Sequence, residues 1–271
     1  MGKALTGTVT TESGTPVAYW RYGKGPPLVL VHGAAADHSR WNPVLPALEE
    51  RFTVYAIDRR GRGGSGDTDD YVLDREVEDV AAVVASLGEP VNLPGHSFGG
   101  LLALEAAWLT PNVRRLVLYD PGIEVAGAEI YPHEVIERME SRLEAGDPAG
   151  VVEITMREVA GLPSETVEFM RTLPVWQARV DAAHTIPREL RAVKSYRLDP
   201  QRFESLGTST LLLSGGDSPA ALRKAVEAVD EVLSDSHHVV MEGQGHSAMD
   251  TGTDLFTAKV LNFLEAPRVG G

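Results

Sequence analysis

Short apolar runs recur along this chain and are separated by amphipathic segments. Residues 28–31 and 52–57 are almost entirely β-branched, aliphatic or aromatic, and so are residues 113–119 apart from Arg114 and Arg115. Such runs are typical of strands that are buried on both faces of a sheet. Residues 74–87 instead carry valines and alanines at helical spacing, and Asp74 is expected to cap that helix. The alternation predicts an α/β protein with a mostly parallel sheet and helical crossovers.

The pattern continues toward both ends of the chain. Residues 6–11 and 17–22 have β character and are joined by a Ser-Gly-Thr-Pro turn, which predicts a hairpin. The remaining expected strands and helices are a helix at 41–50, a strand at 90–93, a helix at 101–109, a strand at 210–214, a helix at 220–233, a strand at 238–241 and a helix at 255–264.

The strand rhythm stops between residues 123 and 205. This stretch is charged and helix-forming, and it contains several prolines. We interpret residues 123–205 as an inserted helical cap, and this segment is called the cap below. The predicted core domain is then formed by residues 1–122 and 206–271.

Composition narrows the function classes. The 271 residues include 25 Lys or Arg and 39 Asp or Glu, and the formal net charge is −14. This acidic balance argues against a nucleic-acid partner and against anionic membranes. There is no cysteine, so thiolate chemistry is excluded. No run is long enough to span a membrane, and the N-terminal residues 1–6 lack the apolar stretch of a secretory signal. We therefore expect a cytoplasmic protein.

The most informative motif is Gly95-His96-Ser97-Phe98-Gly99, between a predicted strand and a predicted helix. A serine in such a sharp turn has a strained backbone, and its hydroxyl stands clear of the sheet. The flanking glycines allow strand and helix to approach closely. The motif predicts a nucleophilic Ser97. The alternative is a glycine-rich loop that carries an ordinary solvated serine.

A serine nucleophile needs a base and an orienting carboxylate, which in a parallel sheet come from loops at the carboxyl ends of strands. His246 follows the last predicted strand and is flanked by glycine, so it is the best candidate of the eight histidines. The side chain of His96 is expected to point away behind the turn. Asp217 is the favoured carboxylate because it follows a strand and two glycines. Asp120, which directly ends the strand at 113–119, stays open as the rival.

Acyl transfer also needs donors for the developing oxyanion. The backbone N–H of Phe98, directly after the serine, is the first candidate. The second is the N–H of Ala34, in the small-residue loop that follows the strand at 28–31.

Together these residues resemble the α/β-hydrolase fold superfamily, in its lid-bearing bacterial serine hydrolase branch. The resemblance rests on residues 28–33, 55–66, 95–100, 210–217 and 243–246, in this order. It implies an eight-stranded, mostly parallel sheet, no cofactor and no metal, with Ser97 as nucleophile, His246 as base and Asp217 as its partner. It also implies that residues 58–66 form a structural loop near the site, whose side chains Arg59, Arg60 and Arg62 we expect in salt bridges.

The expected activity is hydrolysis of small to medium apolar esters or lactones by a monomer or homodimer. Candidate pocket residues are Trp41, His32, Trp176 and Tyr131. A serine in the motif, rather than an aspartate, argues against a dehalogenase or epoxide hydrolase. Carbon–carbon hydrolysis, perhydrolysis and lyase chemistry use the same triad and stay open. Less favoured is a non-catalytic ligand-binding protein of the same fold.

Overall fold

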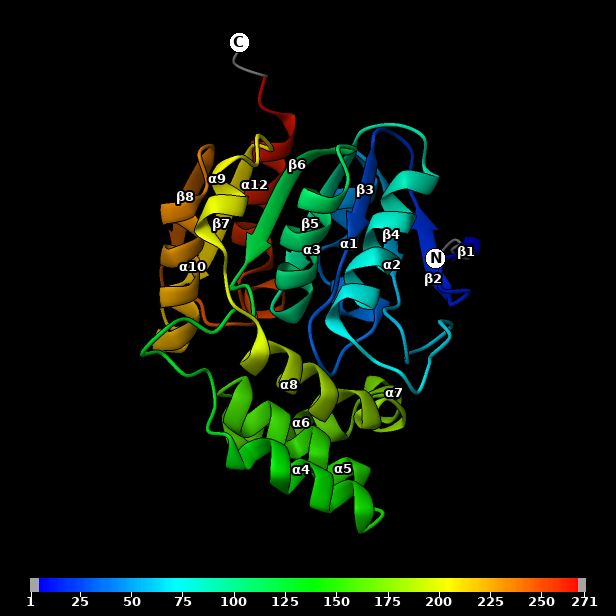
Figure 1. The fold of residues 1–271 in the computed structure, drawn as a ribbon, viewed down its shortest axis with the longest axis vertical. Helices are drawn as coiled ribbons and strands as arrows, with labels where there is room; N and C mark the ends of the chain where they lie inside the picture. The colour runs from blue at the N-terminus through cyan, green and yellow to red at the C-terminus, as the bar shows by residue number, and fades with distance from the viewer. Residues whose placement is uncertain (1–4, 268–271) are drawn as a thin grey trace.

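The computed structural model describes residues 5–267 and has an eight-stranded sheet at its centre (Figure 1). Its strand order is β1-β2-β4-β3-β5-β6-β7-β8. The first two pairings, β1 with β2 and β2 with β4, are antiparallel, and all others are parallel. The predicted fold class is therefore confirmed. The strands are β1 (Leu5–Thr10), β2 (Pro16–Tyr22), β3 (Pro27–Leu30), β4 (Thr53–Ile57), β5 (Val91–His96), β6 (Val113–Tyr119), β7 (Thr210–Gly215) and β8 (Ser236–Met241).

Helices cover both faces of this sheet. One apolar core cluster joins the sheet to α2 (Leu73–Ser86), α3 (Phe98–Leu109) and α10 (Ala220–Val232). The other joins it to α1 (Leu45–Glu49), α11 (Ala248–Thr251) and α12 (Thr253–Glu265).

The alternation of side chains along β6 shows why both faces are apolar. Leu116 and Leu118 enter the first core, while Val117 and Tyr119 enter the second. Successive side chains of a strand point to opposite faces, so the part of β6 that is buried on both sides, residues 116–119, is apolar.

Most of the cap forms a separate helical layer below the sheet in Figure 1, on the side toward which β6 points. Its short connecting turns are a π-helical turn at Thr155–Val159 and a 3₁₀ turn at Ala183–Thr185. The helices are α4 (Glu134–Glu144), α5 (Pro148–Ile154), α6 (Ser164–Arg171), α7 (Val175–Asp181) and α8 (Ile186–Ser195), and α9 (Pro200–Glu204) leads back toward β7.

Two local predictions need correction. The helix expected at 41–50 is instead a 3₁₀ turn, His38–Trp41, followed by α1, because prolines at 43 and 46 interrupt the helical hydrogen bonds. Asp74 is not a cap, because α2 begins one residue earlier and Asp74 lies in its first turn.

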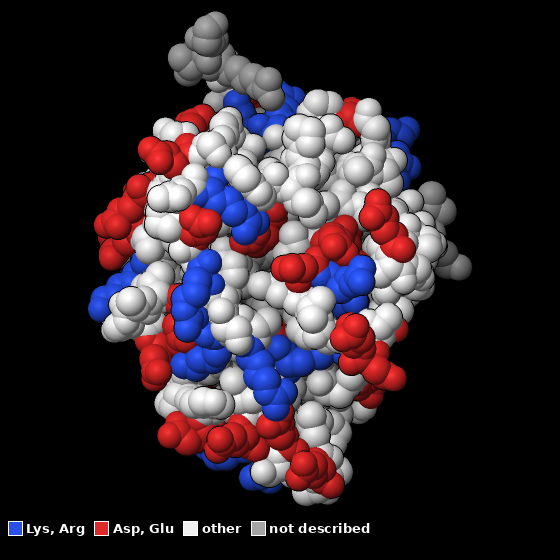
Figure 2. All heavy atoms as spheres, viewed as in Figure 1, with Lys and Arg blue, Asp and Glu red and all other residues white. Residues whose placement is uncertain are grey.

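Acidic and basic side chains are interspersed on the face seen in Figure 2, so neither charge dominates it. Within residues 5–267, no helix has the length and apolar content that crossing a membrane requires. Residues 1–4 of the N-terminal stretch considered above lie outside the described part of the chain.

Candidate active site

Three strained residues mark one edge of the sheet. Ala35, Ser97 and Asp120 have φ angles of 49°, 54° and 42°, and they are the only non-glycine residues with positive φ within residues 5–267. They follow β3, β5 and β6, which are neighbours at the centre of the sheet. Backbone strain of this kind persists only where the surrounding structure enforces it, and it concentrates at functional sites.

Ser97 lies in the turn between β5 and α3, with φ 54° and ψ −126°. A side chain at Gly95 would collide with the carbonyl of Gly99, and one at Gly99 would collide with the carbonyls of Val31 and His32. The two glycines therefore let α3 pack directly against β5 and the end of β3, as the motif predicted.

The loop after β3 lies against the serine. A Cβ atom built at Gly33 would stand 2.8 Å from the Cβ of Ser97. On the other side, Phe98 is the first residue of α3, so its N–H has no partner four residues back within the helix. The two predicted oxyanion donors, at Ala34 and Phe98, therefore belong to segments that flank Ser97.

His246 is paired with Asp120. The Nδ1 atom of His246 lies 3.1 Å from Oδ2 of Asp120, whose side chain is completely buried. The same carboxylate accepts hydrogen bonds from the hydroxyl of Ser218 at 2.6 Å and the N–H of Gly215 at 3.3 Å. Because a carboxylate only accepts, Nδ1 of His246 carries the proton and Nε2 is left as the basic nitrogen.

The prediction of Asp217 as the partner of this histidine is wrong. Asp217 is exposed, and its hydrogen bond is made by the backbone N–H to the carbonyl of Gln244. The turn after β7 directs the next residue, Ser218, inward and leaves Asp217 outside. The rival candidate, Asp120, occupies the position beside His246.

His96 lies against His246 rather than away from it. Their ring centroids are 4.6 Å apart, and Nε2 of His96 donates to the carbonyl of His246 at 2.9 Å. Burial, and then the nearby His246 and Arg40, hold the pKa of His96 well below its usual range, so the ring is neutral. Sequence reasoning missed this support of the histidine loop, for which the motif gives no signal.

The serine hydroxyl makes no hydrogen bond within the described residues. Ser97 is half-buried. The ring of its neighbour His96 lies against the ring of His246. Contacts between nucleophile and base are often long in ligand-free enzymes and tighten when substrate binds. Within residues 5–267, no group of three or more His, Asp or Glu is placed to hold a metal ion.

Comparison with known proteins agrees with this fold. A family model described as the alpha/beta hydrolase family matches residues 28–258. The chain belongs to the alpha/beta hydrolase family. That match includes the strained turn at Ser97 and the histidine loop.

Relatives of this hydrolase differ in their reactions. It is 28% identical to N-formylmaleamate deformylase of Pseudomonas putida, over 99% of this chain and 100% of that protein. It is 26% identical to pimeloyl-[acyl-carrier protein] methyl ester esterase of Stenotrophomonas maltophilia, over 92% of this chain and 97% of that protein. A crystal structure of an alpha/beta hydrolase from Sphaerobacter thermophilus has a TM-score of 0.82 at 33% identity, covering 95% of this chain and 100% of that one.

The four predicted pocket residues have packing contacts in this hydrolase. Trp41 belongs to the core beneath α1 and is 2% exposed. Tyr131 donates its hydroxyl to the carbonyl of Leu190 in the cap, and Trp176 is part of the core cluster that includes the cap. His32 is completely buried, and its Nδ1 donates to the carbonyl of Gly33 at 2.8 Å. Their side chains are therefore committed to packing and internal hydrogen bonds.

Proposed function

We propose that this member of the alpha/beta hydrolase family is a serine hydrolase that cleaves carboxylic esters or lactones of small to medium apolar substrates. The observations that carry the proposal are the strained Ser97 after β5 and the His246–Asp120 pair, whose aspartate follows the neighbouring strand β6. The proposed triad is Ser97, His246 and Asp120, with oxyanion donors at the N–H groups of Phe98 and Ala34. It uses neither a cofactor nor a metal.

In the first step, Nε2 of His246 takes the proton of the Ser97 hydroxyl while the oxygen attacks the ester carbonyl. The resulting oxyanion accepts hydrogen bonds from the two backbone donors, which stabilise the tetrahedral intermediate. His246 then gives its proton to the leaving alcohol as the carbon–oxygen bond breaks. Asp120 holds the imidazole in the required tautomer and stabilises its protonated form.

In the second step, water attacks the acyl-enzyme. His246 removes a proton from the water, and a second tetrahedral intermediate forms at the same donors. Its collapse returns the proton from His246 to the Ser97 oxygen and releases the carboxylic acid. A lactone follows the same course, except that the alcohol and acid leave as one molecule.

A second candidate is hydrolysis of a carbon–nitrogen bond. A relative that matches 99% of this chain is named a deformylase, and others are named as a carbamate hydrolase and a deacetylase. Amide cleavage uses the same steps, with His246 protonating a leaving nitrogen instead of an oxygen. A substrate panel should therefore include matched esters, lactones and N-acyl compounds.

The decisive variant is Ser97→Ala. We expect wild-type protein to hydrolyse p-nitrophenyl butyrate and to be labelled by a fluorophosphonate probe, and we expect the variant to lose both properties. A circular dichroism spectrum and a melting temperature close to wild type serve as the folding control. Turnover by the variant at the wild-type rate would refute the proposed nucleophile.

A further inference from the structure

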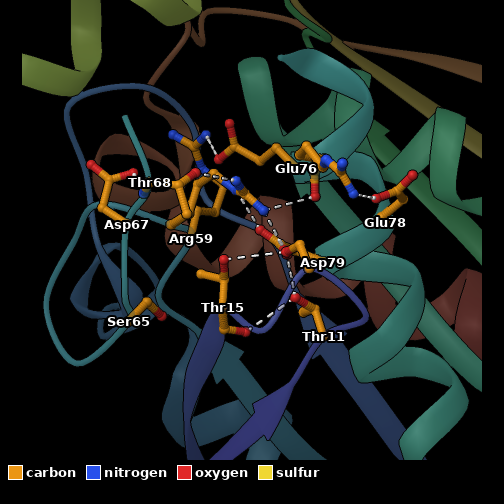
Figure 3. A network of polar contacts seen from close by, with 12 residues as sticks. Thr11, Thr15, Arg59, Ser65, Asp67, Thr68, Glu76, Glu78 and Asp79 are labelled. Carbon is orange, nitrogen blue, oxygen red and sulfur yellow. Dashed lines mark hydrogen bonds and ion pairs between the residues drawn. The ribbon is translucent and has the colours of Figure 1, made fainter. Parts of the chain in front are cut away.

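Beneath the proposed oxyanion loop lies a fully buried cluster of charged side chains. Arg59, in the loop after β4, pairs with Glu76 of α2 at 2.6 Å and with Glu189 of α8 in the cap at 3.1 Å. Arg62 pairs with Glu189 at 2.5 Å, and all four side chains are at most 1% exposed. Figure 3 shows Arg59 and Glu76 pointing toward each other. The expected salt bridges are therefore present, and one partner comes from the cap.

Arg59 also reaches the loop after β3. Its Nη2 donates to the carbonyl of Gly33 at 3.1 Å, and the same oxygen accepts from Nδ1 of His32 at 2.8 Å. The carbonyl of Gly33 and the N–H of Ala34 belong to one peptide group, in which they point in opposite directions. Two donors on the carbonyl therefore fix the direction of the N–H and also increase its strength as a donor.

The same guanidinium contacts the other predicted donor residue. Its central carbon lies 4.8 Å from the ring centroid of Phe98, a cation–π distance. Arg59 thus contacts Gly33, whose peptide group carries the N–H of Ala34, and Phe98, which carries the other proposed donor. From the cap, Arg179 of α7 donates to the carbonyl of Ala35, the strained residue of the same loop.

We propose that Arg59 is a positioning residue that sets the geometry of the oxyanion hole, and that Glu189 of the cap holds Arg59 in place. This inference rests on the proposed function, because it concerns the same oxyanion donors. It gives the cap a part in transition-state stabilisation, in addition to covering the sheet edge.

The charges of the Arg59–Glu189 pair agree with a fixed arrangement. Burial lowers the pKa of Arg59, but Glu189 and Glu76 more than offset it and leave that pKa raised. Burial raises the pKa of Glu189, but Arg59 and Arg62 more than offset it and leave that pKa lowered. Both members of the pair therefore stay charged, and neither can leave its partner without exposing an uncompensated buried charge.

Arg60 provides a matched control on the same loop. It is also buried, and it pairs with Asp79 of α2 through two hydrogen bonds of 2.7 and 2.9 Å. Its other partners are Thr68 and the carbonyl of Arg75, and none of its contacts in the described part of the chain reaches the loop after β3. Figure 3 shows Asp79 next to the Arg59 cluster.

The test compares Arg59→Lys with Arg60→Lys. Lysine keeps the charge but cannot span the carbonyl of Gly33 and two carboxylates at once. We expect Arg59→Lys to lower kcat for p-nitrophenyl butyrate by about 10²-fold with little change in KM, because a displaced oxyanion donor acts on the transition state alone. We expect Arg60→Lys to leave kcat within about threefold of wild type, although both variants lower the melting temperature.

A binding measurement makes the test independent of turnover. An alkyl boronic acid adds to a serine hydroxyl and forms a tetrahedral boronate. One oxygen on this boron lies where the oxyanion would lie. Calorimetry should show its affinity falling with Arg59→Lys by a factor similar to the fall in kcat, and staying unchanged with Arg60→Lys. Equal effects of the two substitutions on boronate affinity would overturn the role of Arg59.

The variant Glu189→Gln tests the contribution of the cap and covers the case in which Arg59→Lys fails to fold. It removes the charge opposite Arg59 and Arg62 with almost no change in volume, and we expect about a tenfold loss of boronate affinity. Unchanged affinity would overturn the proposed link to the cap. If the wild-type protein binds no boronate at Ser97, the proposed function fails instead, so the two failures can be told apart.

Discussion

Two loops leave neighbouring strands at the same edge of the sheet. Each carries an aspartate, but the two aspartates differ in burial and in contacts. Asp120, after β6, is completely buried, has a φ of 42° and accepts from Gly215, Ser218 and His246. Asp217, after β7, is exposed and uses its backbone alone. The difference shows that a position at the end of a strand is not sufficient to make an aspartate the buried partner of the histidine.

The geometry of the two turns explains the difference. Asp120 directly follows β6, and its neighbour Tyr119 accepts a hydrogen bond from the N–H of Ser97 at 3.0 Å. The strand β7 instead ends at Gly215, where an added Cβ would collide with Ser218 and with the carbonyl of Gln244. The inward space of that turn is already filled by Ser218, so Asp217 has no room to enter.

The strongest test of the comparison exchanges each carboxylate for an amide. Asp120→Asn should lower kcat by about 10⁴-fold, because the amide can donate to Nδ1 of His246 and thereby favour the wrong tautomer. Asp217→Asn should change kcat by less than about twofold, as is usual for an exposed side chain away from the site. Steady-state kinetics with p-nitrophenyl butyrate measure both effects.

Melting temperatures provide the control for this pair. Both substitutions keep the size of the side chain, so a folded Asp120→Asn protein without activity assigns the loss to chemistry. The opposite ranking, with Asp217→Asn inactive and Asp120→Asn active, would restore the sequence-based choice.

The pattern of the sequence was sufficient for the sheet and the serine turn. The run 28–31 must be apolar because both faces of the sheet are covered there, and this requirement is visible in the letters alone. The same holds for the glycines around Ser97, since any side chain at Gly95 or Gly99 would meet backbone oxygens. Local sequence carries these features because local sterics cause them.

The partner of His246 depended on contacts that sequence spacing does not encode. The inward direction of Ser218, and the bond between His96 and the carbonyl of His246, arise from packing between distant loops. The charged segment 123–205 was recognised as helical from its sequence, but its contacts with the core were not. Its contact through Glu189 with a core arginine joins residues 130 positions apart, which no periodicity could reveal.

A smaller effect is expected at Ser218, the buried residue of the turn after β7. Ser218→Ala removes the 2.6 Å hydrogen bond to Asp120, and a hydrogen bond to a charged group contributes about 1.5–3 kcal/mol. Because His246 and Gly215 still contact the carboxylate, we expect kcat to fall by only about tenfold.

Ser214→Ala is the matched control for this prediction. Ser214 is also buried at the end of β7, but its hydroxyl bonds to Nε2 of His238 at 2.9 Å, away from Asp120. Its removal should leave kcat unchanged. If both serine variants lose the same activity, the effect belongs to the strand end as a whole and not to the support of Asp120.

The smallest expected effect is on the free energy of unfolding. It concerns His96, which supports the loop of His246. Because the folded state holds the pKa of His96 well below its usual range, the unfolded chain binds this proton first as the pH falls. The associated stability is fully present above the ordinary histidine pKa of about 6.5 and is lost progressively below it. His96→Gln keeps an N–H for the carbonyl of His246 and removes the titration.

Urea unfolding at pH 7.5 and pH 5.5 measures this difference. Wild type should lose about 1.4 kcal/mol more than His96→Gln between these values, which corresponds to one pH unit below the ordinary histidine pKa. The buried His32, with its pKa also lowered, contributes equally to both proteins and cancels. If the free energy of unfolding depends on pH in the same way in wild type and His96→Gln, the His96 ring accepts a proton in the folded state. The buried surroundings of Asp120 and His246 would then be less rigid than their contacts indicate.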